Sequence, residues 1–269
     1  FWRPGPLPAI AQNLRKLEFF APSGRSMNTP MHVAANPAHT VHVQPFVYED
    51  TDTKALHFTI HQQQSLMRVS RPHALQVDYT QVMMGYLLLH RHPQHIAMIG
   101  LGGGSLAKFC RHHFPETRFT AVEINPHVIA MRQDFQIPDD SEHFRVVEAD
   151  GADYVLGVAG QIDVLLVDGF DHQGQSAQLC SLQFYEDCRQ ALTPQGVLVV
   201  NLHNTHALYE VLVARLNTVF AGNIAEVVTN EDGNVIVFAS PTVKITPAAL
   251  RAEVQKYCAD WPSWIARNA

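Results

Sequence analysis

Two acidic residues follow the apolar run at residues 164–167, within the stretch DVLLVDGFDHQG. Asp168 comes directly after the run, and Asp171 follows three residues later. One explanation is turn chemistry at the end of a strand, because Asp and Gly are common in turns. The other is a pair of carboxylates at the mouth of a site, where a carboxylate can accept a proton from a substrate. A turn with Gly169 and Phe170 explains one acid more easily than two, so we favour the working pair.

A glycine-rich turn, GLGGGS, follows another apolar stretch and precedes a candidate helix. Glycines let the backbone turn tightly and approach a ligand closely, and the start of the following helix offers free N–H groups. The glycines that we expect to contact a ligand are Gly100, Gly102, Gly103 and Gly104.

Two further acids end the next two apolar stretches. Glu123 lies about twenty residues after the glycines, where an acid hydrogen-bonds the ribose hydroxyls of a bound nucleoside. Its alternative is a residue at the start of the helix that begins at Pro126. Asp150 can accept from an exocyclic amine such as that of adenine, with Gly151 leaving room for the ring. The alternative for Asp150 is the N-cap of a helix that starts at Ala152.

Strands and helices alternate around these motifs. Apolar strands are expected at residues 95–102, 118–125, 144–150, 163–171 and 193–203, and helices at 105–114, 126–135, 181–192 and 206–220. A hairpin with the turn EDGN follows at 224–240, and a last helix at 246–261. This order predicts an α/β fold with a mostly parallel, doubly wound sheet and an antiparallel C-terminal hairpin. Such sheets bind ligands beyond the C-terminal ends of their strands, where all four motifs lie.

The segment ahead of this sheet divides into two parts. Residues 1–40 are rich in proline and are expected to form an irregular arm. Residues 41–72 are expected to form a small β-domain, with an antiparallel strand pair at 41–69 and a turn at EDTDTK. Residues 73–269 are then expected to form a nucleoside-binding catalytic domain, which opens with an amphipathic helix at 74–91 that carries Tyr79.

Composition excludes several classes of function. The chain has 269 residues and a formal charge of −6, with no run of Lys and Arg, so we expect no nucleic-acid partner. No apolar run approaches the ~20 residues of a membrane span. The four cysteines form no CxxC and are expected to be free thiols in a reducing compartment, the cytoplasm. The histidines lack the spacing of metal ligands, so we expect no metal.

A dinucleotide-binding enzyme would also use glycines and an acid. The antiparallel hairpin after the fifth strand, and the acid that ends the third strand, instead favour the Rossmann-like, methyltransferase-type sheet that binds S-adenosyl donors.

These motifs resemble the spermidine synthase family of polyamine aminopropyltransferases. The glycine turn, VEIN, EADG, VDGFD and FYEDCRQALTPQGVLVVNL occur in the family's order and at its spacing, and the resemblance covers residues 41–240. It implies transfer of an aminopropyl group from decarboxylated S-adenosylmethionine to a polyamine or another amine. The donor would be a co-substrate, with no tightly bound cofactor, and the protein would be a homodimer.

The resemblance also implies roles for individual residues. Asp171 would be the general base, Asp168 would help hold the cationic amines, and Tyr79 would lie near the reacting amine. Glu123 would bind the donor's ribose and Asp150 its adenine. A family glutamine at the donor matches Gln64.

Three positions depart from the family pattern. The family's glycine turn carries an Asp that holds the donor's primary amine, where this chain has Gly103. Thr80 and Gln81 replace a family His or Gln and a Glu after the tyrosine. The family's DS[ST]DP is DGFDHQ here, so the acceptor need not be putrescine. The alternatives are an S-adenosylmethionine-dependent methyltransferase and a non-catalytic protein that binds an adenosyl thioether.

Overall fold

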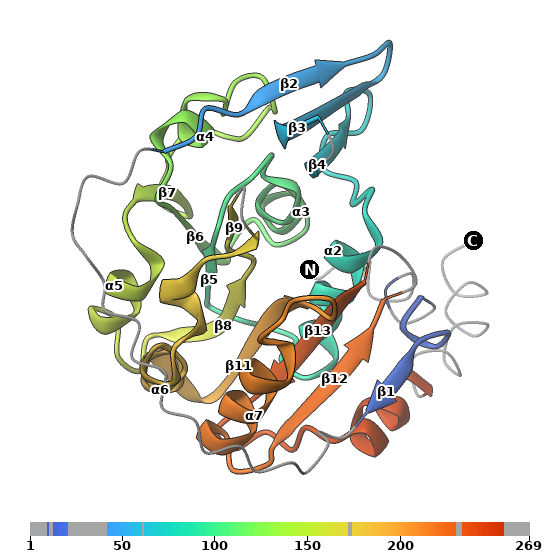
Figure 1. The fold of residues 1–269 in the computed structure, drawn as a ribbon, viewed down its shortest axis with the longest axis vertical. Coiled ribbons are helices and arrows are strands. Elements are labelled where there is room, and N and C mark those ends of the chain that lie inside the picture. Colours follow the sequence, from blue (N-terminus) through green and yellow to red (C-terminus); the bar gives the residue numbers. More distant parts are fainter. Residues whose placement is uncertain are drawn as a thin grey trace.

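The computed structural model describes residue 10 and residues 13–20, 42–60, 62–171, 174–229 and 233–255. Within these residues the main element is an eight-stranded sheet with the strand order β1-β12-β13-β11-β8-β5-β6-β7 (Figure 1). Its strands are β1 (Glu18–Phe20), β5 (His95–Ile99), β6 (Arg118–Glu123), β7 (Phe144–Glu148), β8 (Ile162–Val167), β11 (Leu192–His203), β12 (Ile224–Val228) and β13 (Asn234–Ala239).

The central strands β11, β8, β5, β6 and β7 are parallel to one another. The chain passes from β5 through β6 to β7, and then returns to β8 on the other side of β5. A crevice opens at such a switch in direction, and it is where doubly wound sheets bind ligands. The strands β12 and β13 form an antiparallel hairpin, and β13 pairs antiparallel with β11. The expected doubly wound sheet and C-terminal hairpin are confirmed, although the turn at residues 230–232 lies outside the described residues.

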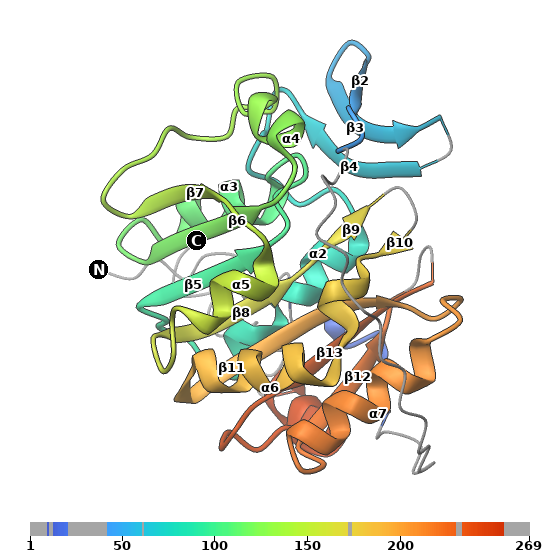
Figure 2. The ribbon, with the colours of Figure 1, turned by 60° about the vertical axis from the view of Figure 1, so that its left-hand side comes forward.

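Helices cover both faces of the sheet (Figure 2). One face carries α2 (Asp78–Met83), the 3₁₀ helix η1 (Met84–Leu88), α3 (Ser105–His113) and α4 (Pro126–Ala130). The other carries η2 (Ala177–Cys180), α5 (Gly151–Leu156), α6 (Leu182–Ala191) and α7 (Tyr209–Val219). Ile96 and Met98 of β5 point into the first core, and Ala97 and Ile99 into the second. Strands buried on both faces read as continuous apolar runs, which is why the sequence marked them clearly.

A separate antiparallel sheet, β2-β3-β4, lies beside α3 and α4 (Figures 1 and 2). Its strands are β2 (Phe46–Glu49), β3 (Thr53–Thr59) and β4 (Gln62–Arg68). The expectation of a strand pair at 41–69 is wrong, because the second expected strand folds back between Thr59 and Gln62. Residues 59–62 include no Gly, Pro, Asn or Asp, so the usual turn residues are missing at that reversal.

Other boundaries also differ from expectation. Residues Glu18–Phe20, inside the arm expected to be irregular, form strand β1 and pair with β12 at the edge of the sheet. The helix expected at 74–91 is shorter, because α2 begins at Asp78 and continues as the 3₁₀ helix η1. The last helix is described over residues 247–255, and Cys258 lies outside the described residues. The cysteines Cys110, Cys180 and Cys188 are buried, and no disulfide joins any of them within the described part of the chain.

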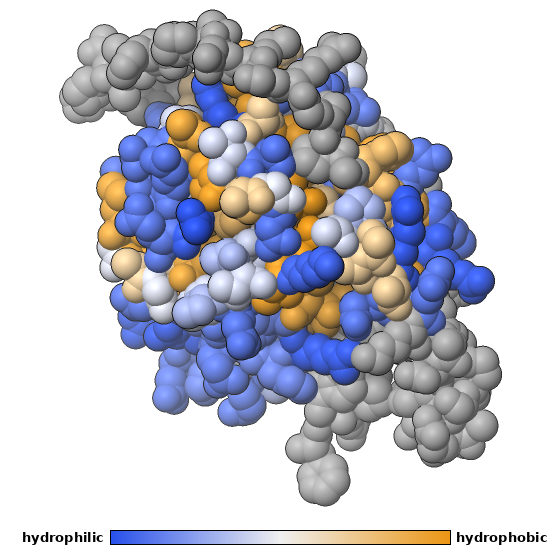
Figure 3. All heavy atoms as spheres, turned by 90° about the horizontal axis from the view of Figure 1, so that it is seen from below, coloured by the Kyte–Doolittle hydropathy of each residue, from blue (hydrophilic) through white to orange (hydrophobic). Residues whose placement is uncertain are grey.

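The surface of the described part is mixed in polarity. Figure 3 shows the face that lies at the bottom of Figure 1. Hydrophilic residues make up much of this face, and hydrophobic residues are exposed among them. None of the described helices combines the length and the hydropathy that crossing a membrane requires.

Candidate active site

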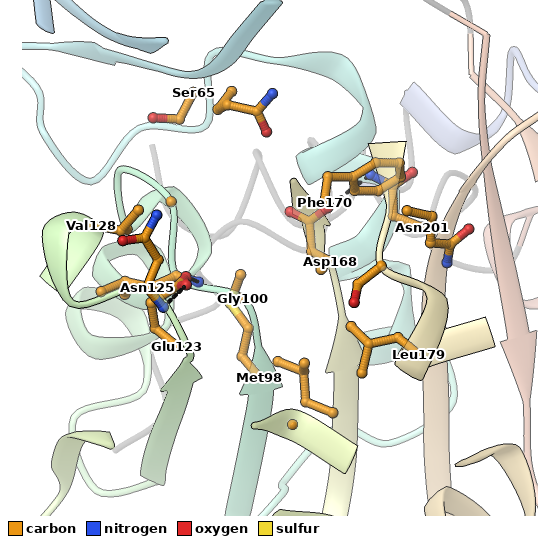
Figure 4. A pocket seen from close by; sticks show the side chains of 18 of the residues that line it. Ser65, Met98, Gly100, Glu123, Asn125, Val128, Asp168, Phe170, Leu179 and Asn201 are labelled. Carbon is orange, nitrogen blue, oxygen red and sulfur yellow. Dashed lines mark hydrogen bonds between the residues drawn. The ribbon is translucent and has the colours of Figure 1, made fainter. Parts of the chain in front are cut away.

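A cavity of about 900 Å³ lies at the C-terminal ends of the central strands. Its walls come from the loops after β5, β6, β7 and β8, from the end of β11, and from β3 and β4 of the small sheet. Glu123 and Asn125 lie on one side of it, and Asp168 and Asn201 on the other, with Gly100 between them (Figure 4). The strand ends that carry the motifs therefore share one cleft, as the sequence predicted.

The glycine turn wraps the first strand end. Gly100 has a φ of +91°, and a Cβ there would lie 2.3 Å from the carbonyl oxygen of Asp168, so no larger residue fits. The backbone of Gly100 thus lies directly against the strand end that carries the acid. Gly102 lines the cavity with open space beside it, and it too has a positive φ of +50°.

The next two glycines have different surroundings. A Cβ on Gly103 would lie 2.1 Å from Oγ of Ser65 and 2.9 Å from the ring of Phe135, so β4 closes the cavity over this position. The Ser65 hydroxyl is buried and has no hydrogen-bond partner among the described residues. Gly104 does not line the cavity, because it precedes α3 with a φ of +67° and packs against Ile137. We expected Gly104 to contact the ligand. Its positive φ and its packing against Ile137 instead explain why a glycine stands there.

Glu123 stabilises the same turn. Its Oε2 accepts from the backbone N–H of Leu101 at 2.8 Å, and its Oε1 accepts from that of Asn125 at 2.9 Å. Burial raises the pKa of the Glu123 carboxyl, and these backbone donors oppose the rise. Each carboxylate oxygen has a second lone pair, so the group can still accept from a ligand hydroxyl. Glu123 therefore does more than precede α4, which was the alternative, because its carboxylate also holds the glycine turn through Leu101.

Asp150 caps α5 and also lines the cavity. Its Oδ1 accepts from the backbone N–H of Ala152 at 2.8 Å, which is the N-cap arrangement weighed as the alternative. The cap uses Oδ1, so Oδ2 can still accept a hydrogen bond from a ligand. Asp150 can therefore be both the N-cap of α5 and a ligand-binding residue. Gly151 also lines the cavity, and a Cβ on it would lie 2.4 Å from Ile99, so close packing of α5 on β5 is a further reason for a glycine here. The room that Gly151 leaves for a ring stays a prediction.

Asp168 is the centre of a side-chain network on the opposite wall. Its Oδ2 accepts from the hydroxyl of Tyr79 at 3.2 Å, and its Oδ1 accepts from Nδ2 of Asn201 at 2.8 Å. Burial raises the pKa of the Asp168 carboxyl, and the two hydrogen bonds oppose that rise. Burial and the neighbouring Asp168 also raise the pKa of the Tyr79 hydroxyl, so Tyr79 remains a donor. The structure thus joins two residues that the sequence singled out, 89 positions apart.

The second acid of the pair is described only through its backbone. Phe170–Asp171 form the short strand β9, which pairs with β10 (Gly174–Gln175) above the cavity. The side chain of Asp171 is not among those described, so its role as a base stays a prediction. Phe170 and Gln175 line the cavity, and within the described part of the chain the buried Oε1 of Gln175 has no hydrogen-bond partner.

Of the remaining residues that the sequence singled out, some line the cavity and one does not. Gln64 lines the cavity, half-buried on β4. Thr80 also lines it, but its hydroxyl donates to the carbonyl of Val77 at 2.5 Å. Gln81 is outside the lining, and its amide bonds Asn13 and the carbonyl of Leu75. The Glu-to-Gln departure at position 81 therefore concerns the fold around α2 and not the cavity wall.

Several residues that line the cavity were not predicted as site residues from the sequence. The most important is Asn201, and others are Ser65, Asn125, Gln175, His203, His206 and Asn234. A signal for Asn201 existed, because it is a polar residue that directly follows the apolar run VLVV of residues 197–200. Among the described residues no cluster of His, Cys, Asp or Glu is arranged to hold a metal ion.

One buried cation lies behind the glycine turn. Nζ of Lys108, in α3, donates to the carbonyl of Phe135 at 2.7 Å and contacts Sδ of Met67 at 2.9 Å. Burial lowers the pKa of the Lys108 ammonium to about 7. The group does not line the cavity, so its main consequence is for stability.

The cavity can perform a definite kind of chemistry. The glycine turn and Glu123 suit a nucleoside with free ribose hydroxyls. The Asp168 carboxylate suits a cationic or nucleophilic amine on the opposite wall. The two walls meet at Gly100, so a nucleoside-bound carbon and an amine nitrogen can be brought together there.

Comparison with known proteins gives a consistent result. A family model described as the spermine/spermidine synthase domain matches residues 77–231. A polyamine aminopropyltransferase from Chromobacterium violaceum is 40% identical over 211 residues, which cover 78% of this chain and 81% of that protein.

Solved structures match in fold. A probable spermidine synthase from Corynebacterium glutamicum has a TM-score of 0.62 and 19% identity, and the match covers 78% of this chain and 82% of that one. Human methyltransferase-like protein 13 in complex with SAH has a TM-score of 0.59 and 24% identity, covering 68% of this chain and 93% of that one. The methyltransferase-type sheet predicted from the sequence is confirmed.

Proposed function

The chain belongs to the spermine/spermidine synthase family, and from this premise we propose that it transfers an aminopropyl group from decarboxylated S-adenosylmethionine to an amine. One observation carries the proposal: the glycine turn, Glu123 and Asp168 line a single cavity. A donor and an acceptor can therefore meet inside it.

The donor end of the cavity consists of Gly100, Gly102, Gly103, Glu123 and Asp150. In the proposed complex the ribose hydroxyls donate to Glu123, whose carboxylate is fixed by two backbone N–H groups. The adenine amine approaches Asp150, whose Oδ1 is already used by Ala152. The sulfonium then lies near Gly100, the glycine that touches the strand end of Asp168.

The acceptor end consists of Tyr79, Asp168, Asn201 and Gln175, together with Asp171. The amine nitrogen attacks the methylene carbon beside the sulfonium, a new C–N bond forms, and the C–S bond breaks. Methylthioadenosine leaves as a neutral thioether, and the nitrogen that has gained a carbon must lose a proton. A free alkyl amine has a pKa of about 10 and is mostly protonated at neutral pH, so its nitrogen must also lose a proton before it has a lone pair for the attack; a nearby carboxylate can take this proton.

The two acids are proposed to divide this work. Both oxygens of Asp168 already accept hydrogen bonds, from Tyr79 and from Asn201, which favours a fixed negative charge that holds the amine. Asp171, on the adjoining strand β9, is proposed as the base. The acceptor is proposed to be a polyamine or a related small amine.

A cytoplasmic homodimer remains the expectation from the resemblance and the free thiols. Light scattering coupled to size-exclusion chromatography measures the mass of the particle. A value near twice the 30.0 kDa of the chain supports the homodimer, and a value near that of one chain contradicts it.

The activity is tested by incubating the protein with decarboxylated S-adenosylmethionine and a set of diamines and polyamines. Mass spectrometry should detect methylthioadenosine and an aminopropylated amine in equal amounts. A parallel reaction contains intact S-adenosylmethionine. Methylated product from the intact donor, with none from the decarboxylated one, would indicate a methyltransferase. Tight binding of methylthioadenosine without turnover of any amine would indicate a non-catalytic member.

A further inference from the structure

Asn201 is the most buried polar side chain in the cavity wall, with 2% of its surface exposed. Its Nδ2 donates to Oδ1 of Asp168 at 2.8 Å, and its Oδ1 accepts from Nδ2 of Asn234 at 2.9 Å. A carboxylate can only accept, so the nitrogen of the Asn201 amide must face Asp168. The hydrogen bond from Asn234 to Oδ1 of Asn201 then holds the amide in that orientation.

The register of three strands produces this chain of contacts. In the parallel pair β8–β11, Val167 lies opposite Val200, so the residues that follow, Asp168 and Asn201, are neighbours. In the antiparallel pair β11–β13, Asn234 lies opposite His203. It reaches Asn201 diagonally, on the same face and two residues along the strand.

Resting on the proposed function, we propose that Asn201 is a positioning residue that aims the Asp168 carboxylate at the acceptor amine and keeps it ionised. Asn234 acts one step further away, by orienting Asn201. Neither residue is proposed to exchange a proton with the substrate.

The physical reason is the cost of a charge in a desolvated wall. Burial raises the pKa of Asp168, and the hydrogen bond from Asn201 opposes that rise. Without the donor, Asp168 takes up a proton at higher pH and no longer attracts a cation. The hydrogen bond from Tyr79, on α2, remains and limits the change.

Other titratable groups surround the same space and must be separated from the effect. The titratable side chains that line the cavity besides Asp168 and Tyr79 are His42, Glu123, Asp150, His203 and His206, and Asp171 lies on β9. A direct measurement on Asp168 is therefore better than a pH profile of activity alone. Carbon-13 NMR of the aspartate carboxyl groups provides it, with the Asp168 signal assigned by its loss in Asp168→Asn.

The experiment compares the wild type with Asn201→Ala, Asn201→Leu and Asn234→Ala. Leucine is nearly the size of asparagine and keeps water from replacing the lost donor. We expect the titration midpoint of Asp168 to rise by about one pH unit in Asn201→Ala, the scale of one hydrogen bond to a charged group. The rise should be larger in Asn201→Leu and smaller in Asn234→Ala.

Aminopropyl transfer is measured on the same proteins from pH 6 to pH 9. In Asn201→Ala the acid limb of kcat/KM should move to higher pH together with the NMR midpoint, so the loss of activity should be larger at the acid end of the range than at pH 9. Circular dichroism confirms that each variant is folded, and Asn201→Ser, which restores a short donor, should recover part of the loss.

Two results would overturn the inference. One is an Asp168 midpoint that is the same in the wild type and in both Asn201 variants. The other is a loss of activity in Asn201→Ala that is equal at every pH, as a purely structural role would give. Failure of the proposed function looks different: the wild type transfers no aminopropyl group, while the NMR titration still reports on Asn201.

Discussion

At the proposed donor end of the cavity the key carboxylate is held by backbone N–H groups, whereas at the proposed acceptor end it is held by side chains. At the donor end, backbone N–H groups of Leu101 and Asn125 fix the Glu123 carboxylate. At the acceptor end, Tyr79 and Asn201, from α2 and β11, fix Asp168. Backbone groups cannot be changed by substitution, but side chains can. The difference indicates that a substitution in a supporting residue can disturb the Asp168 carboxylate directly, whereas the support of the Glu123 carboxylate depends on the backbone path of the glycine turn.

Removing the proposed base gives the largest expected effect. Asp171→Asn should leave binding of methylthioadenosine nearly unchanged and lower turnover by about a hundredfold or more, the scale of losing a general base. Single-turnover kinetics and calorimetry measure the two quantities. Asp134→Asn, an exposed acid outside the cavity lining, serves as the control. Equal turnover in Asp171→Asn and in the wild type would remove Asp171 from the mechanism.

A substitution at the proposed donor end should have the opposite pattern, with its main effect on nucleoside binding. Glu123→Ala should weaken methylthioadenosine binding by about 10- to 100-fold, because a hydrogen-bonded charged group contributes roughly 1.5–3 kcal/mol. It also leaves the N–H groups of Leu101 and Asn125 without their acceptor. Calorimetry gives the affinity directly. Unchanged affinity, with turnover alone reduced, would place Glu123 at the wrong end of the cavity.

These two ends were not equally predictable from sequence. Glu123 and Gly100 follow apolar strands in a local pattern, and the structure places both in the cavity. The contact between Asn201 and Asp168 depends on β11 lying beside β8 in one register, which no local pattern states. Asn201 was missed for that reason, although its position after an apolar run was visible.

Errors of detail have similar physical causes. A glycine pattern does not say which glycine faces a ligand, and Gly104 packs against Ile137 instead. The third strand of the small sheet was missed because its turn near Ile60 lacks the usual turn residues. Asp150 could not be assigned to one role, since an N-cap and a cavity wall coincide there.

The contact between the small sheet and the glycine turn offers a smaller test of the proposed donor end. Gly103→Ala should lower the free energy of unfolding by about 1–3 kcal/mol, because the new Cβ meets Ser65 and Phe135 in a filled space. Combining it with Ser65→Gly removes the nearest of these contacts and should recover part of the loss. Urea unfolding measures both. A stable single variant would mean that β4 can move away from the glycine turn.

The smallest expected effect concerns the buried cation behind that turn. Folded Lys108 loses its proton near pH 7, whereas in the unfolded chain it keeps the proton until its ordinary pKa of 10.5. Between these values unfolding takes up a proton, so stability should rise with pH by about 1 kcal/mol per pH unit. Lys108→Met should remove this rise in urea titrations at pH 7, 8 and 9. A slope that is the same in the variant and the wild type would assign the pH dependence to other groups.

The central claim is that both ends of one cavity face a single adenosyl thioether, and a crystal structure with methylthioadenosine bound tests it most directly. We expect the ribose hydroxyls on Glu123, the adenine beside Asp150, and the sulfur directed toward Asp168 and Asp171. A nucleoside bound elsewhere, or carboxyl groups of Glu123, Asp150 and Asp171 that point into separate regions, would contradict the account.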